Sequence, residues 1–219
     1  MSATSVLATP ARPLSLLDLL LPRLTAAHNL LLAFAGSLFV ALCAQISLPL
    51  PFSPVPVTGQ TFAVLLLGAA FGARRSAAAL AFYLLEGALG LPVFAPGGVP
   101  GLARLLGPTG GYLLAFPAAA FLAGWILERS ERRAWWSWLV AVLAAEAVIF
   151  GAGVWWLRAV TLTGWAEAAQ LGLLPFLPGE ILKVALLAAA LPASWWAAQT
   201  AIRPVGGVHR DAERRRPLS

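Results

Sequence analysis

Lys183 is the residue whose type and position point most clearly to a chemical role. Of the fifteen Lys and Arg residues it is the one lysine, and it lies inside a long apolar segment. A charge near the centre of a bilayer costs about 2.5–3.5 kcal/mol on insertion scales, so it needs a partner or a function. Glu180 precedes it by three residues, a spacing that places both side chains on one face of a helix.

The residues before this pair predict an anion site. Pro178-Gly179 is typical of a helix start, where free backbone N–H groups and the positive end of the helix dipole attract negative charge. Lys183 and this helix start can hold one carboxylate attached to an apolar body, and Glu180 can accept a hydrogen bond from a ligand N–H group. The alternative is structural: Glu180 is a favourable first-turn acid, and Lys183 is its partner and reaches the membrane interface.

Four more features are candidates for a binding site. Glu86 lies in the outer third of an apolar segment and is predicted to line a pocket. Glu146 lies in the middle of another apolar segment. It either carries a proton or contacts a ligand, or neighbouring helices satisfy its hydrogen bonds. Arg104 is either solvated or helps to neutralise a ligand. Gly110-Gly111-Tyr112 supplies a tight turn, a close backbone approach and one aromatic hydroxyl, but it follows no strand and is therefore not a dinucleotide fingerprint.

The residue types present exclude several classes of chemistry. His28 and His209 lie at the edges of the apolar region, and Cys43 is the one cysteine. An intramembrane zinc site, a Ser–His protease site and an intramolecular disulfide are therefore not expected. There is no Walker A motif. Neither a metal nor a cofactor is predicted.

The composition indicates an integral membrane protein. Of 219 residues, 60% are hydrophobic and 11% are charged, and a soluble domain of this size could not cover its surface with so few charges. The net charge of +6 comes from arginine clusters between apolar runs. This pattern is typical of membrane loops, so nucleic-acid binding is not expected. No removable signal peptide is predicted, because there is no A-x-A-like cleavage site before a soluble domain.

Six apolar runs approach the roughly 20 helical residues that span a bilayer. They predict an all-α bundle of six transmembrane helices at 28–47, 57–73, 76–94, 110–128, 135–158 and 179–200. Short interfacial helices are predicted at Gly164–Leu174 and Leu14–Leu24. The chain then divides into an N-terminal tail (1–27), a membrane domain (28–200) and a basic tail (201–219).

The arginines predict the orientation of these spans. With the N-terminus in the cytoplasm, twelve arginines fall on the cytoplasmic side: Arg12, Arg23, Arg74, Arg75, Arg129, Arg132, Arg133, Arg203, Arg210, Arg214, Arg215 and Arg216. The outer side holds Arg104 and Arg158. Because Lys and Arg are enriched in cytoplasmic loops, both termini are predicted to be cytoplasmic.

Three segments rich in Pro, Gly and Phe then fall on the outer side, at 49–56, 91–108 and 173–179. They contain helix breakers but are too apolar for ordinary solvated loops. Irregular backbone at membrane depth is tolerated where it lines a cavity. The segments therefore predict a capped pocket on the outer side, the alternative being that Pro and Gly merely end helices.

A stripe of small residues runs along the first predicted span, where Ala33, Ser37 and Ala41 recur at intervals of four. Small side chains let another helix approach closely, since no hydrophobic drive acts between helices in lipid. The stripe is therefore either a docking face for a partner protein or an internal packing face.

Taken together, these motifs resemble the BioY family, the biotin-binding S components of energy-coupling-factor (ECF) vitamin transporters. The resemblance covers about residues 28–192 and rests on the runs 49–52, 54–58, 60–61, 90–95, 107–112 and 175–180, with Lys183. It implies a six-helix protein of a prokaryotic cell membrane that takes up biotin from outside and catalyses no reaction. It also implies docking onto a transmembrane T component with two ATPases, with some members working without that module, alone or as oligomers. The family usually has Asp at the position of Glu180.

The resemblance also implies a set of biotin-binding residues. Lys183 and nearby N–H groups are expected to take one polar end of biotin, with its orientation left open. The remaining contacts are expected from Glu180, Gln60, Thr58, Tyr112, Gly110, Gly111, Phe94, Phe52, Glu86 and Arg104. Replacing Lys183 with Ala is expected to weaken biotin binding at least tenfold.

Three other functions remain as alternatives. An S component for another vitamin would keep the architecture but prefer a ligand such as thiamine or riboflavin. An intramembrane enzyme using Glu86 or Glu146 as acid or base would turn over a substrate. A membrane scaffold would show no saturable binding.

Overall fold

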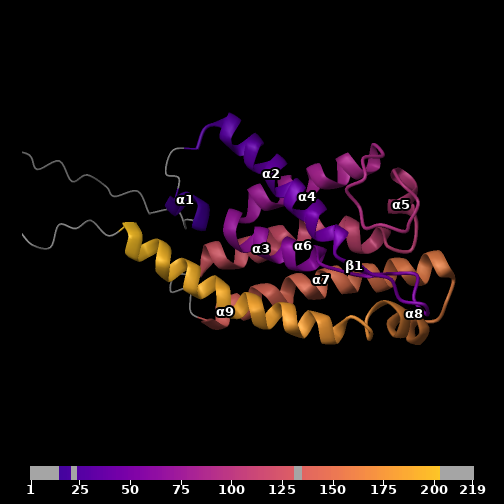
Figure 1. Cartoon of the computed structure of the whole chain (residues 1–219). Coiled ribbons are helices and arrows are strands. Elements are labelled where there is room, and N and C mark those ends of the chain that lie inside the picture. Colours follow the sequence, from indigo (N-terminus) through magenta and orange to yellow (C-terminus); the bar gives the residue numbers. More distant parts are fainter. Residues whose placement is uncertain (1–14, 21–23, 131–134, 203–219) are drawn as a thin grey trace, which may run out of the picture.

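The computed structural model describes residues 15–20, 24–130 and 135–202 as a bundle of helices with one small hairpin (Figure 1). The elements in chain order are α1 (Leu16–Leu20), α2 (Ala26–Gln45), β1 (Ser47–Leu48), β2 (Val57–Thr58), α3 (Gln60–Phe71), α4 (Ala73–Ala88), α5 (Leu102–Leu106), α6 (Gly110–Arg129), α7 (Trp135–Thr161), α8 (Trp165–Gly172) and α9 (Leu177–Ile202). Within the described residues, six helices have twelve residues or more, and they coincide with the six apolar runs of the sequence. The mostly helical fold class is therefore confirmed.

Three of the described helices, α2, α6 and α7, are long and apolar enough to cross a membrane. The pair α8–α9 bends by 54° and counts as a fourth crossing if it is one broken span. Helix α3 is apolar but has only 12 residues, and α4 begins with two arginines. Six crossings with both termini in the cytoplasm thus stay a prediction.

The two short helices predicted beside the membrane are present. Helix α8 lies within the range expected for an interfacial helix, and α1 lies within the N-terminal one. Most of the basic C-terminal tail lies outside the described residues. The sequence did not predict β1 and β2, which pair antiparallel with Ser47 opposite Thr58, nor α5, a five-residue helix in the long α4–α6 connection.

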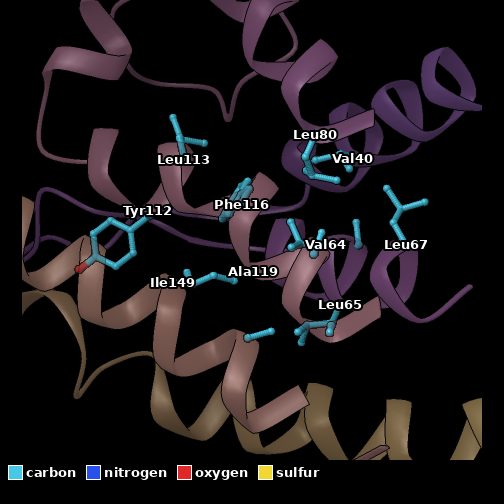
Figure 2. Packing of buried hydrophobic residues seen from close by; sticks show 14 of the residues in the cluster. Val40, Val64, Leu65, Leu67, Leu80, Tyr112, Leu113, Phe116, Ala119 and Ile149 are labelled. Carbon is cyan, nitrogen blue, oxygen red and sulfur yellow. The ribbon is translucent and has the colours of Figure 1, made fainter. Parts of the chain in front are cut away.

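Helix α6 lies at the centre of the bundle and packs against α3, α4 and α7. Its side chains Leu113, Phe116 and Ala119 are buried among residues of these neighbours (Figure 2). Small residues allow the close approach that helix packing in lipid requires. A Cβ added at Gly111 would clash with Trp156 of α7, and one added at Gly68 would clash with the α6 backbone.

The small-residue stripe of α2 packs inside the bundle. Ser37 and Ala41 are buried, and Ala33 is partly buried against the core. The adjacent Gly36 contacts Ala79 of α4 so closely that an added Cβ would clash with it. In this conformation Ser37 and Ala41 therefore form an internal packing face, and their role in docking a partner stays a prediction.

Candidate ligand-binding site

A small cavity lies where the β1–β2 hairpin, the α4–α6 connection and the start of α9 meet. Its volume is about 50 Å³. The apolar lining consists of Val55, Pro56, Phe94, Ala95, Leu113, Phe116, Ile149, Phe150 and Phe176, and the polar lining of Thr58, Gln60, Thr61, Arg104, Thr109, Tyr112 and Glu180. All three Pro-, Gly- and Phe-rich segments contribute to this lining, so residues far apart in the chain converge on one site.

The three segments are also joined to their surroundings by hydrogen bonds. The hydroxyl of Ser53 donates to the carbonyl oxygen of Leu171 at 2.7 Å, which ties the hairpin loop to α8. The amide of Gln45 donates to the carbonyl oxygen of Phe94 at 3.4 Å, which ties α2 to the α4–α6 connection. These contacts hold the hairpin loop and the α4–α6 connection over the cavity in this conformation.

Three aromatic rings form one wall. Tyr112 of α6 stacks on Phe176, with ring centroids 6.5 Å apart, and meets Phe150 edge-on at 6.0 Å. The Tyr112 hydroxyl donates to the carbonyl oxygen of Gly172 at 2.7 Å and points away from Phe116 and Ile149 (Figure 2). Tyr112 therefore offers the cavity its ring, whereas its hydroxyl, which the sequence suggested for a polar ligand group, is engaged in holding α8.

Glu180 and Lys183 form a buried ion pair in the first turns of α9. The Lys183 Nζ lies 2.7 Å from Glu180 Oε1, and the two side chains are 14% and 8% exposed. The ammonium also donates to the Thr58 carbonyl oxygen and to the Thr61 hydroxyl, each at 2.7 Å. The Thr61 hydroxyl in turn lies 3.0 Å from Glu180 Oε2. All three ammonium protons thus have protein acceptors, and it is Glu180 that lines the cavity.

A chain of hydrogen bonds holds Gln60 at the cavity wall. The Thr58 hydroxyl donates to Gln60 Oε1 at 3.0 Å, Gln60 Nε2 donates to the Tyr83 hydroxyl at 2.6 Å, and Tyr83 donates to the carbonyl oxygen of Val93 at 3.1 Å. Tyr83 is fully buried and packs edge-on against Phe94. This chain orients both Gln60 and Phe94, which is a role that the sequence did not reveal for Tyr83.

Arg104 brings a buried cation to the opposite wall. It lies on α5, well apart from the start of α9 (Figure 1), and it is 8% exposed. Its Nη2 donates to the carbonyl oxygen of Ala95 at 3.0 Å, while its buried Nε has no hydrogen-bond partner in the described part of the chain. Burial lowers the pKa of Arg104 from its ordinary value, but a guanidinium stays protonated in proteins. The group therefore retains both charge and hydrogen-bonding capacity for a ligand.

Gly98 makes room for this arginine. A Cβ at that position would occupy the place of Arg104 Nη1 and clash with the guanidinium carbon. The glycine thus leaves free the space that the Arg104 guanidinium occupies in this conformation, a link that no sequence motif displays.

The structure brings six of the predicted binding residues into the cavity lining: Thr58, Gln60, Phe94, Arg104, Tyr112 and Glu180. Lys183 lies behind Glu180 and outside the lining. Gly110 and Gly111 are also outside it, because they pack against Leu105 and Trp156. Glu86 is buried away from the lining, with Oε2 lacking a hydrogen-bond partner among the described residues.

Several lining residues were not predicted from the sequence, and one aromatic ring that was expected in the lining lies outside it. Phe52 is exposed and does not line the cavity. Phe116, Ile149 and Phe150 belong to apolar helices in which every turn carries similar residues, so only helix packing shows which of them face the cavity. Thr61 was part of a recognised motif, but its link to Glu180 spans 119 positions of sequence.

The fold and this cavity define a helical protein with membrane-length apolar helices and an aromatic-walled cavity that both apolar and polar side chains line. The family model of the BioY family matches residues 15–200. Biotin transporter BioY2 of Lactococcus lactis is 35% identical over 163 residues, which are 74% of this chain and 87% of the relative. The probable biotin transporter BioY of Pyrococcus horikoshii is 43% identical over 152 residues, covering 68% and 86%. This chain belongs to the BioY family.

A solved structure shares the fold. It is described as the S-component for biotin from an ECF-type ABC transporter, and it superposes with a TM-score of 0.69 at 25% sequence identity. The superposition covers 77% of this chain and 93% of the solved one. The predicted family resemblance is therefore confirmed, and the likeness extends across most of the helical bundle.

Proposed function

We propose that this chain captures biotin in the aromatic-walled cavity and carries it across the plasma membrane of a prokaryote as the substrate-binding component of an ECF transporter. Membership of the BioY family and the names of its relatives support this reading. The observation that carries it is the pairing, in one apolar cavity, of a buried guanidinium with available donors and a buried carboxylate. Biotin has the complementary groups, a carboxylate at one end and two ureido N–H donors at the other.

The two walls favour one orientation of the ligand. Because Lys183 already has three acceptors, including Glu180, it has no proton left for a ligand carboxylate. Arg104 is the cation that lines the cavity with an unpartnered N–H group. The biotin carboxylate is therefore assigned to Arg104, where an ion-assisted hydrogen bond can form. The ureido N–H groups are assigned to Glu180, and the rings and chain to Phe94, Phe176 and the Tyr112 ring.

The cavity must widen to take the vitamin. Its volume of about 50 Å³ is far below the roughly 300–1,000 Å³ of typical ligand pockets. The hairpin loop and the α4–α6 connection are the non-helical parts of the wall. Their outward movement is the change that admits biotin with the least disturbance of helix packing.

Transport itself is assigned to an assembly. The solved neighbour is an S-component of an ECF-type transporter, and the proposed partners of this chain are a T component and two ATPases, which supply the energy. Co-purification of the chain with these subunits, followed by ATP-dependent biotin accumulation in proteoliposomes, tests this part. Uptake by the chain alone would show that the ATPase module is dispensable.

Isothermal titration of the purified protein in detergent tests the ligand. Biotin is expected to bind saturably at one site per chain, whereas thiamine and riboflavin are not. Biotin methyl ester, which lacks the anionic end, is expected to bind about 100-fold more weakly, since losing one partner of a buried charge pair costs about 2–5 kcal/mol. Binding of thiamine or riboflavin in place of biotin would overturn the assignment of the ligand, and equal affinity for the ester would overturn its orientation.

A further inference from the structure

Glu146 is a buried acid that the proposed biotin contacts do not use. It lies in the middle of α7 and is 8% exposed. Both of its carboxyl oxygens are buried and have no hydrogen-bond partner among the residues that the structure describes. An ionised carboxylate buried without a donor is strongly disfavoured, so this position requires an explanation.

The charged groups facing Glu146 come from α9. They are Glu180 and Lys183, and Ile149 and Phe150, one turn beyond Glu146 on α7, line the same cavity as Glu180. The other helices packed against α7 are α3, α6 and α8. Helix α3 carries no ionisable residue. Helix α6 carries Tyr112, which donates to Gly172, and Glu128 and Arg129 at its other end. Helix α8 carries Glu167 in its first turn.

The charges of this cluster do not balance when all groups are ionised. Lys183 contributes one positive charge, while Glu146 and Glu180 contribute two negative charges. The three Lys183 protons go to Thr58, Thr61 and Glu180, so none reaches Glu146. One added proton makes the cluster neutral and turns one carboxyl into a donor toward the other. Two carboxyl groups that share a site hold a proton in this way because both cannot ionise together.

We propose that Glu146 and Glu180 share one proton and that this proton is bound together with biotin. The proposal rests on the proposed function, because it takes Glu180 as the acceptor of the biotin ureido N–H groups. In the bound state Glu180 must be the carboxylate, so the proton resides on Glu146 and is donated to Glu180. Above the pH at which the ligand-free pair loses its proton, biotin binding requires proton uptake. Affinity then falls by up to tenfold for each pH unit.

Titration across pH tests this linkage. Biotin affinity of the wild-type protein is expected to be constant at the acid end of the range 6–9.5 and to fall at the alkaline end. The Glu146→Gln variant carries a permanent donor toward Glu180. It is expected to stay within about threefold of the wild-type affinity at pH 6 and to show no alkaline fall. Calorimetry in two buffers of different ionisation enthalpy is expected to find up to one proton taken up per biotin in the wild type and none in the variant.

A constant wild-type affinity without proton uptake would overturn the proposal, as would an unchanged alkaline fall in Glu146→Gln. A ligand-free readout separates this proposal from the biotin assignment. The infrared spectrum of the wild-type protein at pH 7 is expected to contain the carbonyl band of a protonated carboxyl that disappears at pH 9.5. Its absence at pH 7 refutes the shared proton even if the variant does not fold. Failure to bind biotin at every pH, with the band present, refutes the biotin function and the linkage but leaves the shared proton standing.

Discussion

Two ion pairs at opposite ends of the bundle have the same length but different surroundings. Lys183 and Glu180, at the start of α9, and Arg75 and Asp18, which join α4 to α1, are each 2.7 Å apart. The first pair is 14% and 8% exposed, the second 25% and 28%. Figure 1 places α1 and the start of α9 toward different ends of the molecule. The contact distance is thus equal, whereas the burial of the two pairs differs.

The pair at the α1 end belongs to an open polar region. Arg75 Nε also donates to Asn29 at 2.9 Å, and Asp18 accepts from the Ser15 hydroxyl at 2.9 Å. Asp18 and Arg75 line a cavity of about 700 Å³ together with Arg74, Glu128 and Arg129. Partial burial acts to raise the pKa of Asp18, but hydrogen bonds from Arg75 and Ser15 outweigh it and lower the pKa below its ordinary value.

The two pairs show that the contribution of an ion pair to the free energy of unfolding depends on how far its charges are removed from water. Removing one partner of a buried pair costs about 3–5 kcal/mol, because the other charge stays desolvated. An exposed pair contributes about 0–1 kcal/mol, because water and salt screen it. The α9 pair therefore holds a charged carboxylate in an apolar cavity, whereas the α1 pair fastens a short helix to the bundle.

The largest expected effect is that of Lys183→Ala. The substitution leaves Glu180 buried without its cation, so we expect a loss of about 3–5 kcal/mol in the free energy of unfolding. Biotin affinity is expected to fall at least tenfold. Thermal unfolding in detergent and calorimetric titration measure the two quantities. The Lys183→Ala, Glu180→Gln double variant is expected to regain stability but not affinity. If Lys183→Ala were as stable as the wild type, the α9 pair would contribute as little to the free energy of unfolding as the α1 pair.

Arg104→Gln is expected to have the next largest effect, on affinity rather than on stability. Loss of the cation assigned to the biotin carboxylate is expected to weaken binding about 100-fold, or about 2.7 kcal/mol. The biotin affinity of Arg104→Lys is expected to lie between those of the wild type and Arg104→Gln, because an ammonium keeps the charge but lacks the planar fork of a guanidinium. For biotin methyl ester the Gln variant is expected to bind as the wild type does. An equal loss for biotin and ester would mean that Arg104 only supports the wall.

Gly111→Ala tests whether the cavity depends on the approach of α6 to α7. The added Cβ would clash with Trp156, and overpacking costs about 1–3 kcal/mol, so a lower unfolding temperature is expected. Gly151→Ala, on α7, is the matched control, because its Cβ would meet nothing within 4 Å. Equal unfolding temperatures for the two variants would contradict the packing role of Gly111.

Asp18→Asn is expected to have the smallest effect. The pKa of Asp18 is lowered in the folded protein, so its ionised form stabilises the fold above the ordinary pKa of about 3.9, and this contribution disappears as the pH falls through the folded pKa. We expect a loss of at most about 1 kcal/mol at pH 7 and a smaller loss near pH 3. Unfolding followed at both pH values checks this. A loss of equal size at both pH values would show that the carboxylate charge is not its cause.

Much of the fold follows from local pattern. The apolar runs predict the six long helices because each run is long enough to satisfy its own backbone hydrogen bonds in lipid. The shared face of Glu180 and Lys183 follows in the same way, since a spacing of three depends on the helix alone. The hairpin and α5 were not predicted, because two-residue strands and one helical turn leave no periodic signal.

The sequence by itself determined the helical membrane fold, the family and most of the polar residues of the cavity, because these depend on residue type and short spacing. The tertiary structure alone decided that Lys183 gives its protons to Thr58, Thr61 and Glu180, and that Arg104 lines the cavity with its Nε unpartnered among the described residues. It also decided that Gly111 serves helix packing. The contacts of Lys183 with Thr58 and Thr61 join residues more than a hundred positions apart, and Gly111 meets Trp156 of another helix. Such distances are set only when the helices pack.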